Sequence, residues 1–397
     1  MNTKLGNGKL TIALEGRIDS NNASQFEKDL FAALDAAPDA PPVLDAEKLE
    51  YISSAGLRVL MKLRKRVNAP VRMDNVSREV YEILEVTGFA ELFTVKKALR
   101  EISVEGCDLI GSGGYGSVYR IDPETIAKIY NPGLPLSFVE KEREVSQKAF
   151  LLGVPTAISY DVIRCGESYG TVYELLDAKT VTEVISEDPG RIPEMGQRMG
   201  KLLKELHQIP VQPDSAFPDR KAKLLDWLRK TVSAYLTPDE LDRISAFTEQ
   251  IPNRNTFLHG DFHAKNIMVR DGEFSLIDIG DAAYGHPVFD LAEMMFVYLI
   301  LSATQVRTVE EREKIIGFKL EYAKPLWGAI CGAYFGTGDM NEIGKITQTL
   351  MPYCNLLSAF QSLTAAGSDE RVVRAIVDRS LREWMLPAIA RSQPLDW

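Results

Sequence analysis

The sequence predicts an α/β sandwich followed by a larger α+β unit in which strands come first and helices follow. Three observations lead to this fold class. Strand and helix patterns alternate over residues 1–97, which is typical of an α/β layer structure. Short β-rich segments then dominate residues 98–178. Apolar residues repeat at helical spacing over most of residues 179–397. We therefore expect three regions with these limits.

The composition is that of an ordinary globular protein, with 45% hydrophobic and 26% charged residues. The net charge is -10, and residues 1–97 contain equal numbers of basic and acidic residues, so the whole acidic excess lies in residues 98–397. An acidic second part argues against a nucleic-acid partner, because nucleic-acid phosphates require a basic face. It favours a cationic or neutral substrate.

The cysteines stand far apart and form no Cys-x-x-Cys pair, which indicates free thiols in a reducing compartment rather than disulfides or a zinc site. They are Cys107, Cys165, Cys331 and Cys354. Residues 1–16 contain no apolar signal-peptide core. The longest apolar run, Leu291–Ala303, includes Glu293 and is too short to span a bilayer. We expect a soluble, cytoplasmic protein without a membrane partner.

In the first region, Ser20–Asn22 offers a cap for the first helix, which carries Phe26, Leu30 and Leu34 on one face. The expected order is a strand at Lys9–Gly16, a helix at Ala23–Leu34, a strand at Val43–Asp45, a helix that follows Ser54, a strand at Val71–Met73 and a helix from Ser77 to Gly88.

Residues 1–97 also resemble the STAS domain, the fold of anti-sigma factor antagonists. The resemblance is carried by Leu14–Asp19, Tyr51–Arg58 and Val86–Phe93. It implies a domain for regulation or for binding a protein partner. In that family a partner kinase phosphorylates a serine at the start of the second helix, where free backbone N–H groups stabilise a phosphate.

The position that usually carries this serine, immediately before Gly56, is Ala55 in this sequence. Ser54 and Ser53 precede it by one and two places. Ser54 is therefore the candidate phosphosite. The alternative is that both serines only cap the helix.

The second region begins with a glycine-rich stretch, Ile110–Arg120, that contains Gly111, Gly113 and Gly116. A dinucleotide fold requires a helix to open within such glycines, whereas β-formers such as Val118 follow here. Strand, flexible glycines and strand are typical of the protein-kinase loop that covers ATP phosphates, with Val118 over the adenine. The alternative is a simple hairpin turn.

Lys128 stands in an apolar strand, ten residues after Val118 of this loop. A lysine there is either a solvent-facing edge residue or the kinase lysine that contacts the α- and β-phosphates. We expect the second, with a carboxylate partner on the next helix. Glu142 lies on the apolar stripe of that helix and is the expected partner of Lys128. Glu144 points away from this stripe and is the alternative partner. The hinge that binds adenine is expected at Glu174–Ala178.

The third region contains the most informative stretch, Phe257–Val269, with His259, Gly260, Asp261 and Asn266 in one turn between apolar segments. A second apolar segment then delivers Asp278. Phosphoryl transfer requires a carboxylate to orient the attacking hydroxyl and oxygen ligands to hold Mg²⁺ against the nucleotide phosphates. The alternative is a β-hairpin with ordinary polar turn residues.

The pattern His-Gly-Asp-x-His-x-x-x-Asn followed by Ile-Asp-x-Gly resembles the catalytic loop of the aminoglycoside phosphotransferase and choline kinase-like family. These relatives of protein kinases mostly phosphorylate small molecules. The resemblance implies a bilobal protein kinase-like fold, with a β-rich N-lobe at 98–178 and a mainly helical C-lobe at 179–397. It implies ATP and Mg²⁺ as cofactors and a small hydroxylated acceptor, bound in a pocket that the C-terminal helices shape.

Within this resemblance, Asp261 is the catalytic base, and Asn266 and Asp278 are the metal ligands. The nucleotide is held by Gly111, Gly113, Gly116, Val118, Lys128, Glu142 and Glu174. The remaining polar residues are expected to support the loop: His259 as a scaffold, His263 by a hydrogen bond near the magnesium loop, His207 as a core histidine and Asp290 by hydrogen bonds to nearby backbone.

Three functions stay open. The first is a phosphotransferase that acts on a hydroxyl of a small molecule, with a STAS domain as its regulator. The second is a protein serine kinase in an anti-sigma-type partner switch, acting on Ser54. The third is a nucleotide-sensing pseudokinase that serves as an interaction module. The presence of Lys128, Asp261, Asn266 and Asp278 argues against the third, because decayed kinases usually lose one of these groups.

Overall fold

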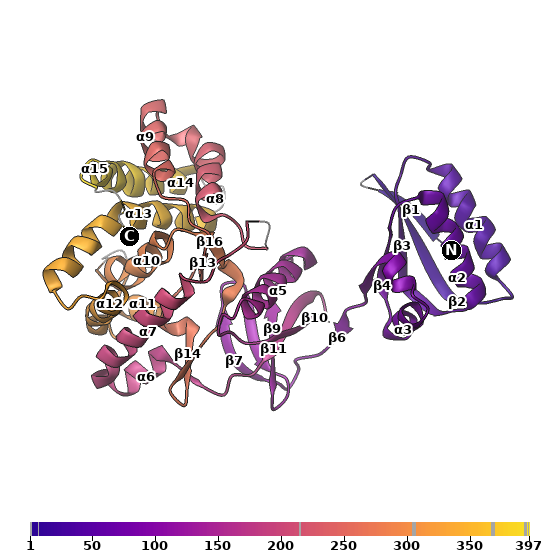
Figure 1. The fold of residues 1–397 in the computed structure, drawn as a ribbon, viewed down its shortest axis with the longest axis horizontal. Coiled ribbons are helices and arrows are strands. Elements are labelled where there is room, and N and C mark those ends of the chain that lie inside the picture. The colour runs from indigo at the N-terminus through magenta and orange to yellow at the C-terminus, as the bar shows by residue number, and fades with distance from the viewer. Residues whose placement is uncertain are drawn as a thin grey trace. The chain divides into compact units, whose positions relative to one another are not determined.

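The computed structural model describes residues 2–6, 8–213, 216–303, 307–366, 370–392, 395 and 397 (Figure 1). They form two compact units. The first consists of Met1–Ser103 with Ile163–Gly166, and the second of Val104–Val162 with Glu167–Trp397. Each unit has its own hydrophobic core.

The first unit is built on a five-stranded sheet in the order β1-β2-β3-β4-β5, in which β1 is antiparallel to β2 and the other neighbours are parallel. The strands are β1 (Asn2–Gly6), β2 (Lys9–Ile18), β3 (Pro42–Ile52), β4 (Val71–Val76) and β5 (Phe93–Lys97). The helices are α1 (Ala23–Ala36), α2 (Ser54–Val67), α3 (Arg78–Val86) and α4 (Phe89–Leu92).

Alternating burial along the strands explains this arrangement. Leu10, Ile12 and Leu14 of β2 are buried while their neighbours are more exposed, so the core lies on one face of the sheet. Helix α1 contributes Phe26 and Leu30 to the same core. The predicted α/β sandwich is confirmed.

Two strands of this unit were not predicted. Every side chain of β1 is exposed, so the strand has no apolar alternation, and only its backbone pairing with β2 defines it. Strand β5 has a single buried side chain, Phe93, and ends in two lysines. Strand β3 is also longer than the predicted Val43–Asp45, because Leu49 and Ile52 continue its buried face.

The second unit begins with a β-rich part whose sheet has the order β10-β11-β9-β8-β7. Helix α5 packs against β11. These elements are β7 (Asp108–Gly113), β8 (Gly116–Arg120), β9 (Thr125–Tyr130), α5 (Leu136–Leu151), β10 (Ser159–Cys165) and β11 (Ser168–Glu174). The short strand β6 (Arg100–Glu101) pairs in parallel with Ile163 and Arg164, which the first unit includes.

The rest of the second unit is mainly helical, and the predicted β-rich and helical parts are both confirmed. Its two small sheets have the orders β12-β14-β15 and β13-β16. Their strands are β12 (Lys179–Thr180), β13 (Thr256–Leu258), β14 (Ile267–Arg270), β15 (Glu273–Leu276) and β16 (Ala283–Gly285). The α-helices are α6 (Val181–Glu187), α7 (Ile192–Leu206), α8 (Arg220–Trp227), α9 (Pro238–Glu249), α10 (Val288–Met295), α11 (Val309–Ile316), α12 (Leu320–Phe335), α13 (Met340–Ala366), α14 (Glu370–Ile376) and α15 (Leu386–Ile389). The 3₁₀ and π segments are η1 (Pro189–Arg191), η2 (Leu228–Val232), η3 (Ser233–Tyr235), η4 (Ala264–Asn266), η5 (Ile279–Asp281), η6 (Phe296–Leu301) and η7 (Val377–Met385).

Helix α7 packs closely against α12 because two of its residues are glycines. A Cβ added at Gly200 would lie 2.4 Å from the backbone oxygen of Ile330, and one at Gly196 would lie 2.5 Å from the Cβ of Ala329. Because these two positions have no side chain, α7 can lie close to α12.

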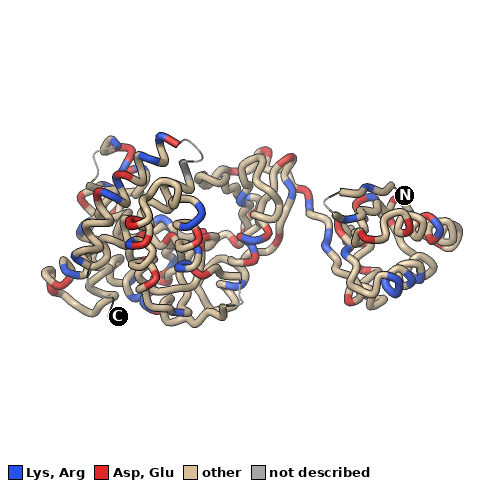
Figure 2. Tube along the Cα trace, turned by 90° about the horizontal axis from the view of Figure 1, so that it is seen from above, with Lys and Arg blue, Asp and Glu red and all other residues tan. Residues whose placement is uncertain are grey.

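Acidic and basic positions are interspersed along both units (Figure 2). All four cysteines are free, as predicted. Of the helices that the structure describes, none combines the length and the apolar character that crossing a bilayer requires.

Candidate active site

The turn at residues 259–266, which we call the Asp261 loop, joins β13 to β14. These two strands do not pair with each other. Strand β13 pairs with β16, whereas β14 pairs with β15 and β12. The chain therefore does not form a hairpin across this loop, which is held between two small sheets.

The carboxylate of Asp261 is held by two neighbours. Its Oδ2 accepts a hydrogen bond of 3.0 Å from Nδ2 of Asn266, and its Oδ1 lies 3.3 Å from Nε2 of His263. Burial alone would raise the pKa of Asp261, but the interactions with His263 and Asn266 lower it to about 2. Asp261 is thus ionised at neutral pH. His263 contacts this carboxylate rather than the loop at Asp278, where we expected it.

Asp290 fixes the backbone at the start of the Asp261 loop. Its Oδ2 accepts a hydrogen bond from the backbone N–H of His259, and its Oδ1 accepts one from the N–H of Gly260, both at 2.9 Å. His207 adds a contact of 3.1 Å to Oδ2 and 2.7 Å to the hydroxyl of Tyr334. The expected structural roles of Asp290 and His207 agree with these contacts.

His259 is fully buried and faces the protein interior. Its Nδ1 accepts a hydrogen bond of 3.2 Å from the N–H of Asp261. Burial lowers its pKa, so the imidazole is neutral at pH 7. Gly260 has a φ of +79°, and a Cβ there would lie 2.2 Å from the backbone oxygen of Asp281. Only glycine fits this position.

The backbone brings Asn266 and Asp278 together. The N–H of Ile277 donates to the oxygen of Asn266 at 3.0 Å, which places Asp278 beside that residue. Asp278 adopts a left-handed conformation with a φ of +59°. Such backbone strain in a residue other than glycine is common at functional sites.

An amide oxygen and a carboxylate are ligands that suit Mg²⁺. Among the described residues, no cluster of three or more Asp, Glu, His or Cys could hold a metal alone. A magnesium ion at Asn266 and Asp278 would take its other ligands from phosphate oxygens and water, as Mg²⁺ does at many nucleotide sites. The residues present therefore fit this ion.

Lys128 connects the β-rich part with this loop region. Its Nζ lies 2.7 Å from Oε1 of Glu142 and 2.8 Å from Oδ1 of Asp278. Burial opposes its charge, but the two carboxylates raise the pKa of Lys128. The structure thus places Glu142 against Lys128, while Glu144 pairs with Lys148 on the outside of the helix.

The glycine-rich stretch forms a tight hairpin in which Gly113 pairs with Gly116 across two turn residues. A Cβ at Gly116 would lie 2.1 Å from the backbone oxygen of Ile129, so close strand packing requires this glycine. The space around Gly111 and Gly113 is open. Asn131 fixes the turn, since its side chain donates to the oxygen of Gly114 at 2.8 Å.

Val118 and Glu174 lie on strands near Lys128. Val118 is directly opposite Lys128 in the pairing of β8 with β9, and it is half-buried. Glu174 ends β11. Both its N–H and its side chain bond to the backbone of Ile158, at 2.9 Å and 3.4 Å. The functional roles of both residues stay predictions.

A buried ion pair between Arg220 and Glu293 was not predicted. Both side chains are almost fully inaccessible, and Nη2 of Arg220 contacts Oε1 of Glu293. Burial raises the pKa of Glu293 to about 8, against the effect of Arg220. A glutamate in the apolar run of α10 is a signal that a partner is required. Arg220 lies 73 residues away, so the sequence could not identify it.

In the first unit, Ser53 is the N-cap of α2, and its side chain accepts a hydrogen bond of 3.4 Å from the N–H of Gly56. Ser54 is the first residue of the helix and is exposed. The capping alternative therefore describes Ser53. Phosphorylation of Ser54 stays a prediction.

Two family models match this chain, over residues 1–102 and residues 107–325. The model of the phosphotransferase enzyme family matches residues 107–325, more than half of the chain. The model of the STAS domain matches residues 1–102. Among curated proteins, BtrV of Bordetella bronchiseptica, named as an anti-sigma factor antagonist, is 37% identical over 91 residues, which are 22% of this chain and 78% of BtrV. A STAS-domain containing protein of Pseudomonas aeruginosa is 31% identical over 90 residues, which are 22% of this chain and 87% of that protein.

Similar solved structures include a choline/ethanolamine kinase family protein from Mesorhizobium loti, with 16% identity, 72% of this chain and 91% of that chain covered, and a TM-score of 0.45. The structure of the gentamicin–APH(2")-IIa complex has 16% identity and a TM-score of 0.46. This match covers 79% of this chain and 99% of that chain. The two family models thus assign residues 107–325 and residues 1–102. The chain therefore belongs to the phosphotransferase enzyme family, and its N-terminal part is a STAS domain.

Proposed function

We propose that this protein uses ATP and Mg²⁺ to transfer the γ-phosphoryl group to a hydroxyl of a small molecule, and that its STAS domain regulates it or binds a partner. The observation that carries the proposal is the position of Lys128, whose Nζ bridges Glu142 of α5 and Asp278 of the helical part. The same three groups are required to orient nucleotide phosphates in kinases.

In this proposal, Lys128 holds the α- and β-phosphates and Glu142 fixes its position. Gly111, Gly113 and Gly116 allow the hairpin to cover the phosphates, and Val118 and Glu174 border the adenine. Asn266 and Asp278 would hold Mg²⁺, which would supply positive charge to neutralise the nucleotide phosphates.

Asp261 is the proposed base. The acceptor oxygen forms a bond with the γ-phosphorus, the bond from that phosphorus to the bridging oxygen of ADP breaks, and the hydroxyl proton passes to Asp261. A pKa of about 2 means that Asp261 is ionised and acts mainly by orienting the hydroxyl, taking the proton as the bond forms. Asn266 and His263 keep its two oxygens in place.

A protein serine kinase is the second candidate. Ser54 is exposed at the start of α2, and the curated relatives of this region include a protein named as an anti-sigma factor antagonist. Ser54 would then be the acceptor, in the same chain or in another copy. We also keep a cytoplasmic location and the domain limits 1–97, 98–178 and 179–397 as predictions.

Incubation of the full chain with γ-³²P-ATP and Mg²⁺, with and without a panel of hydroxylated metabolites, separates these candidates. Label in a small molecule that disappears in Asp261→Asn supports the proposal. Label on the protein that disappears in Ser54→Ala supports the serine kinase instead. ATP binding without label or hydrolysis would contradict both and indicate a nucleotide-sensing module.

A further inference from the structure

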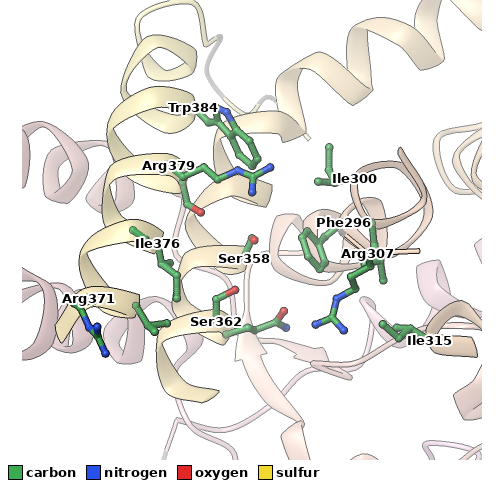
Figure 3. A pocket seen from close by; sticks show the side chains of 15 residues that line it. Phe296, Ile300, Arg307, Ile315, Ser358, Ser362, Arg371, Ile376, Arg379 and Trp384 are labelled. Carbon is green, nitrogen blue, oxygen red and sulfur yellow. The ribbon is translucent and has the colours of Figure 1, made fainter. Parts of the chain in front are cut away.

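A cavity lies within the helical part of the second unit (Figure 3). It has a volume of about 850 Å³, which is suitable for a metabolite-sized ligand. Phe296 and Ile300 of η6 form one wall, and Arg379 and Trp384 of η7 form another. Gln361 of α13 also lines the cavity.

The charge of this cavity differs from that of the rest of the region. The fifteen described residues that line it include three arginines, Arg307, Arg371 and Arg379, and no Asp or Glu. Residues 98–397 as a whole are acidic, which favours a cationic substrate when composition alone is considered. The acidic excess does not extend to the cavity, so composition is a poor guide to its ligand.

Two of the arginines are suitably arranged to hold an anion. In Figure 3, Arg307 and Arg379 extend into the cavity from opposite sides, and Ser358 and Ser362 also line it. The guanidinium carbon of Arg379 lies 4.6 Å from the ring centroid of Trp384. Stacking against a ring orients a guanidinium and leaves its N–H edge able to form paired hydrogen bonds with a carboxylate or phosphate.

The cavity is connected to the Asp261 loop by side chains and by a continuous helix. Gln361 donates a hydrogen bond of 3.4 Å to Glu293, which lies on α10. Segment η6 continues α10, and each of the two segments contacts the loop. Asp290 of α10 accepts hydrogen bonds from the N–H groups of His259 and Gly260, and the hydroxyl of Tyr298 of η6 accepts one from the N–H of Ala264 at 2.9 Å.

We propose that the phosphoryl acceptor is an anion, a hydroxylated metabolite with a carboxylate or phosphate group on a partly apolar body. This inference rests on the proposed phosphotransferase function. Arg307 and Arg379 bind the anionic group, and Phe296 and Trp384 contact the apolar body. The acceptor hydroxyl then points toward Asp261.

The test uses the full chain, γ-³²P-ATP and Mg²⁺. A deproteinised bacterial metabolite extract is divided by ion exchange at pH 7 into anionic, cationic and neutral pools, and each pool is offered as acceptor. We expect Asp261-dependent label in the anionic pool. Treating that pool with phosphatase, which is then removed by filtration, distinguishes the two anions: label that persists indicates a carboxylate, and label that is lost indicates a phosphate.

Variants of the cavity test the assignment of the arginines. Arg379→Gln and Arg307→Gln should each raise the amount of anionic pool needed for half-maximal labelling by about 10-fold or more, the usual effect of losing a charge-assisted hydrogen bond. Arg379→Lys should recover part of this loss. The KM for ATP should not change. Arg243→Gln, which removes an exposed arginine of α9, is the matched control and should label like the wild type.

The failure of this inference can be separated from that of the proposed function. Asp261-dependent label only in the cationic or neutral pool, or Asp261-dependent ATP hydrolysis without label in any pool, would overturn the anionic acceptor and leave the nucleotide chemistry standing. Wild-type labelling by both Arg→Gln variants would also overturn it. No Asp261-dependent turnover under any condition would refute the proposed function, and the inference with it.

Discussion

Gly280 lies directly against the side chain of Glu142. A Cβ added at Gly280 would be 2.8 Å from Cγ of Glu142, a distance that real Cβ contacts do not tolerate. The missing side chain lets α5 approach the turn that follows Asp278. Lys128 can therefore reach both carboxylates at once. The glycine of the Ile-Asp-x-Gly pattern has a packing role that no local turn rule reveals.

We expect Gly280→Ala to impair nucleotide turnover. The added methyl group must displace Glu142, and overpacking of this kind typically costs about 1–3 kcal/mol. If most of this cost falls on the Lys128 geometry, kcat/KM for ATP should fall by about 10-fold or more. Gly344→Ala is the control, because the space at Gly344 is open. Wild-type kcat/KM in Gly280→Ala would show that the contact does not matter for activity.

Glu142→Gln should reduce turnover more than Glu144→Gln. The first change removes one of the two carboxylates that hold Lys128, which leaves the lysine paired with Asp278 alone. Loss of a hydrogen bond to a charged group predicts a decrease in kcat/KM for ATP of about 10- to 100-fold. The second change removes only an exposed pair with Lys148. Equal kinetics in the two variants would contradict the role of Glu142.

Asp290→Asn should destabilise the helical part. The carboxylate accepts hydrogen bonds from the N–H groups of His259 and Gly260 and contacts His207, and an amide cannot replace all three. We expect the free energy of unfolding to fall by about 2–4 kcal/mol, as measured by urea denaturation. Tyr334→Phe removes one hydrogen bond of the same network and should cost about 1 kcal/mol. Similar losses in both variants would refute the central position of Asp290.

The sequence predicted the parts of the fold that repeat a local pattern. The helical stripe of α5 selected Glu142 over Glu144, and the alternation of residue types over Lys9–Gly16 identified β2. Strands β1 and β5 lack such a pattern, because β1 is fully exposed and β5 has one buried side chain. Pairing with a neighbour defines them, and a single segment contains no information on its neighbour.

The same holds for the candidate site, where consecutive residues could be recognised from the sequence but distant partners could not. The turn from His259 to Asn266 could be recognised from its spacing, since its residues are consecutive. The partner of Glu293 could not, because Arg220 lies 73 residues away. The positive charge of the cavity could not be predicted from the sequence either. Arg307 precedes α11 and Arg379 lies in η7, so they are far apart in the sequence, and the composition of the region has the opposite sign.

Stability should decrease as the pH falls below about 6.5, where an exposed histidine becomes protonated. His286 is buried and its Nε2 lies 3.1 Å from the backbone oxygen of Trp397. Burial lowers its pKa to about 4. The unfolded chain therefore binds a proton that the folded chain does not bind between these values. The stability that neutral His286 provides is complete above pH 6.5 and is lost as the pH falls toward 4.

For this one histidine, the free energy of unfolding should fall by about 2 kcal/mol between pH 7.5 and pH 5. Denaturation of the wild type and of His286→Gln at both pH values measures the difference. The variant should lose less stability than the wild type over this interval. Some loss should remain, because burial also lowers the pKa of His259. An identical decrease in both proteins would contradict the assignment to His286.

The most direct test of the central claim compares ATP binding and ATP turnover in the wild type and in Asp261→Asn, with Mg²⁺ and the anionic metabolite pool present. Asparagine preserves the shape of the side chain but cannot accept the proton of the hydroxyl. We predict that turnover falls by about 10²- to 10⁴-fold, the usual contribution of a general base, while the Kd for ATP, measured by calorimetry, stays close to that of the wild type. Unchanged turnover in Asp261→Asn would contradict the account.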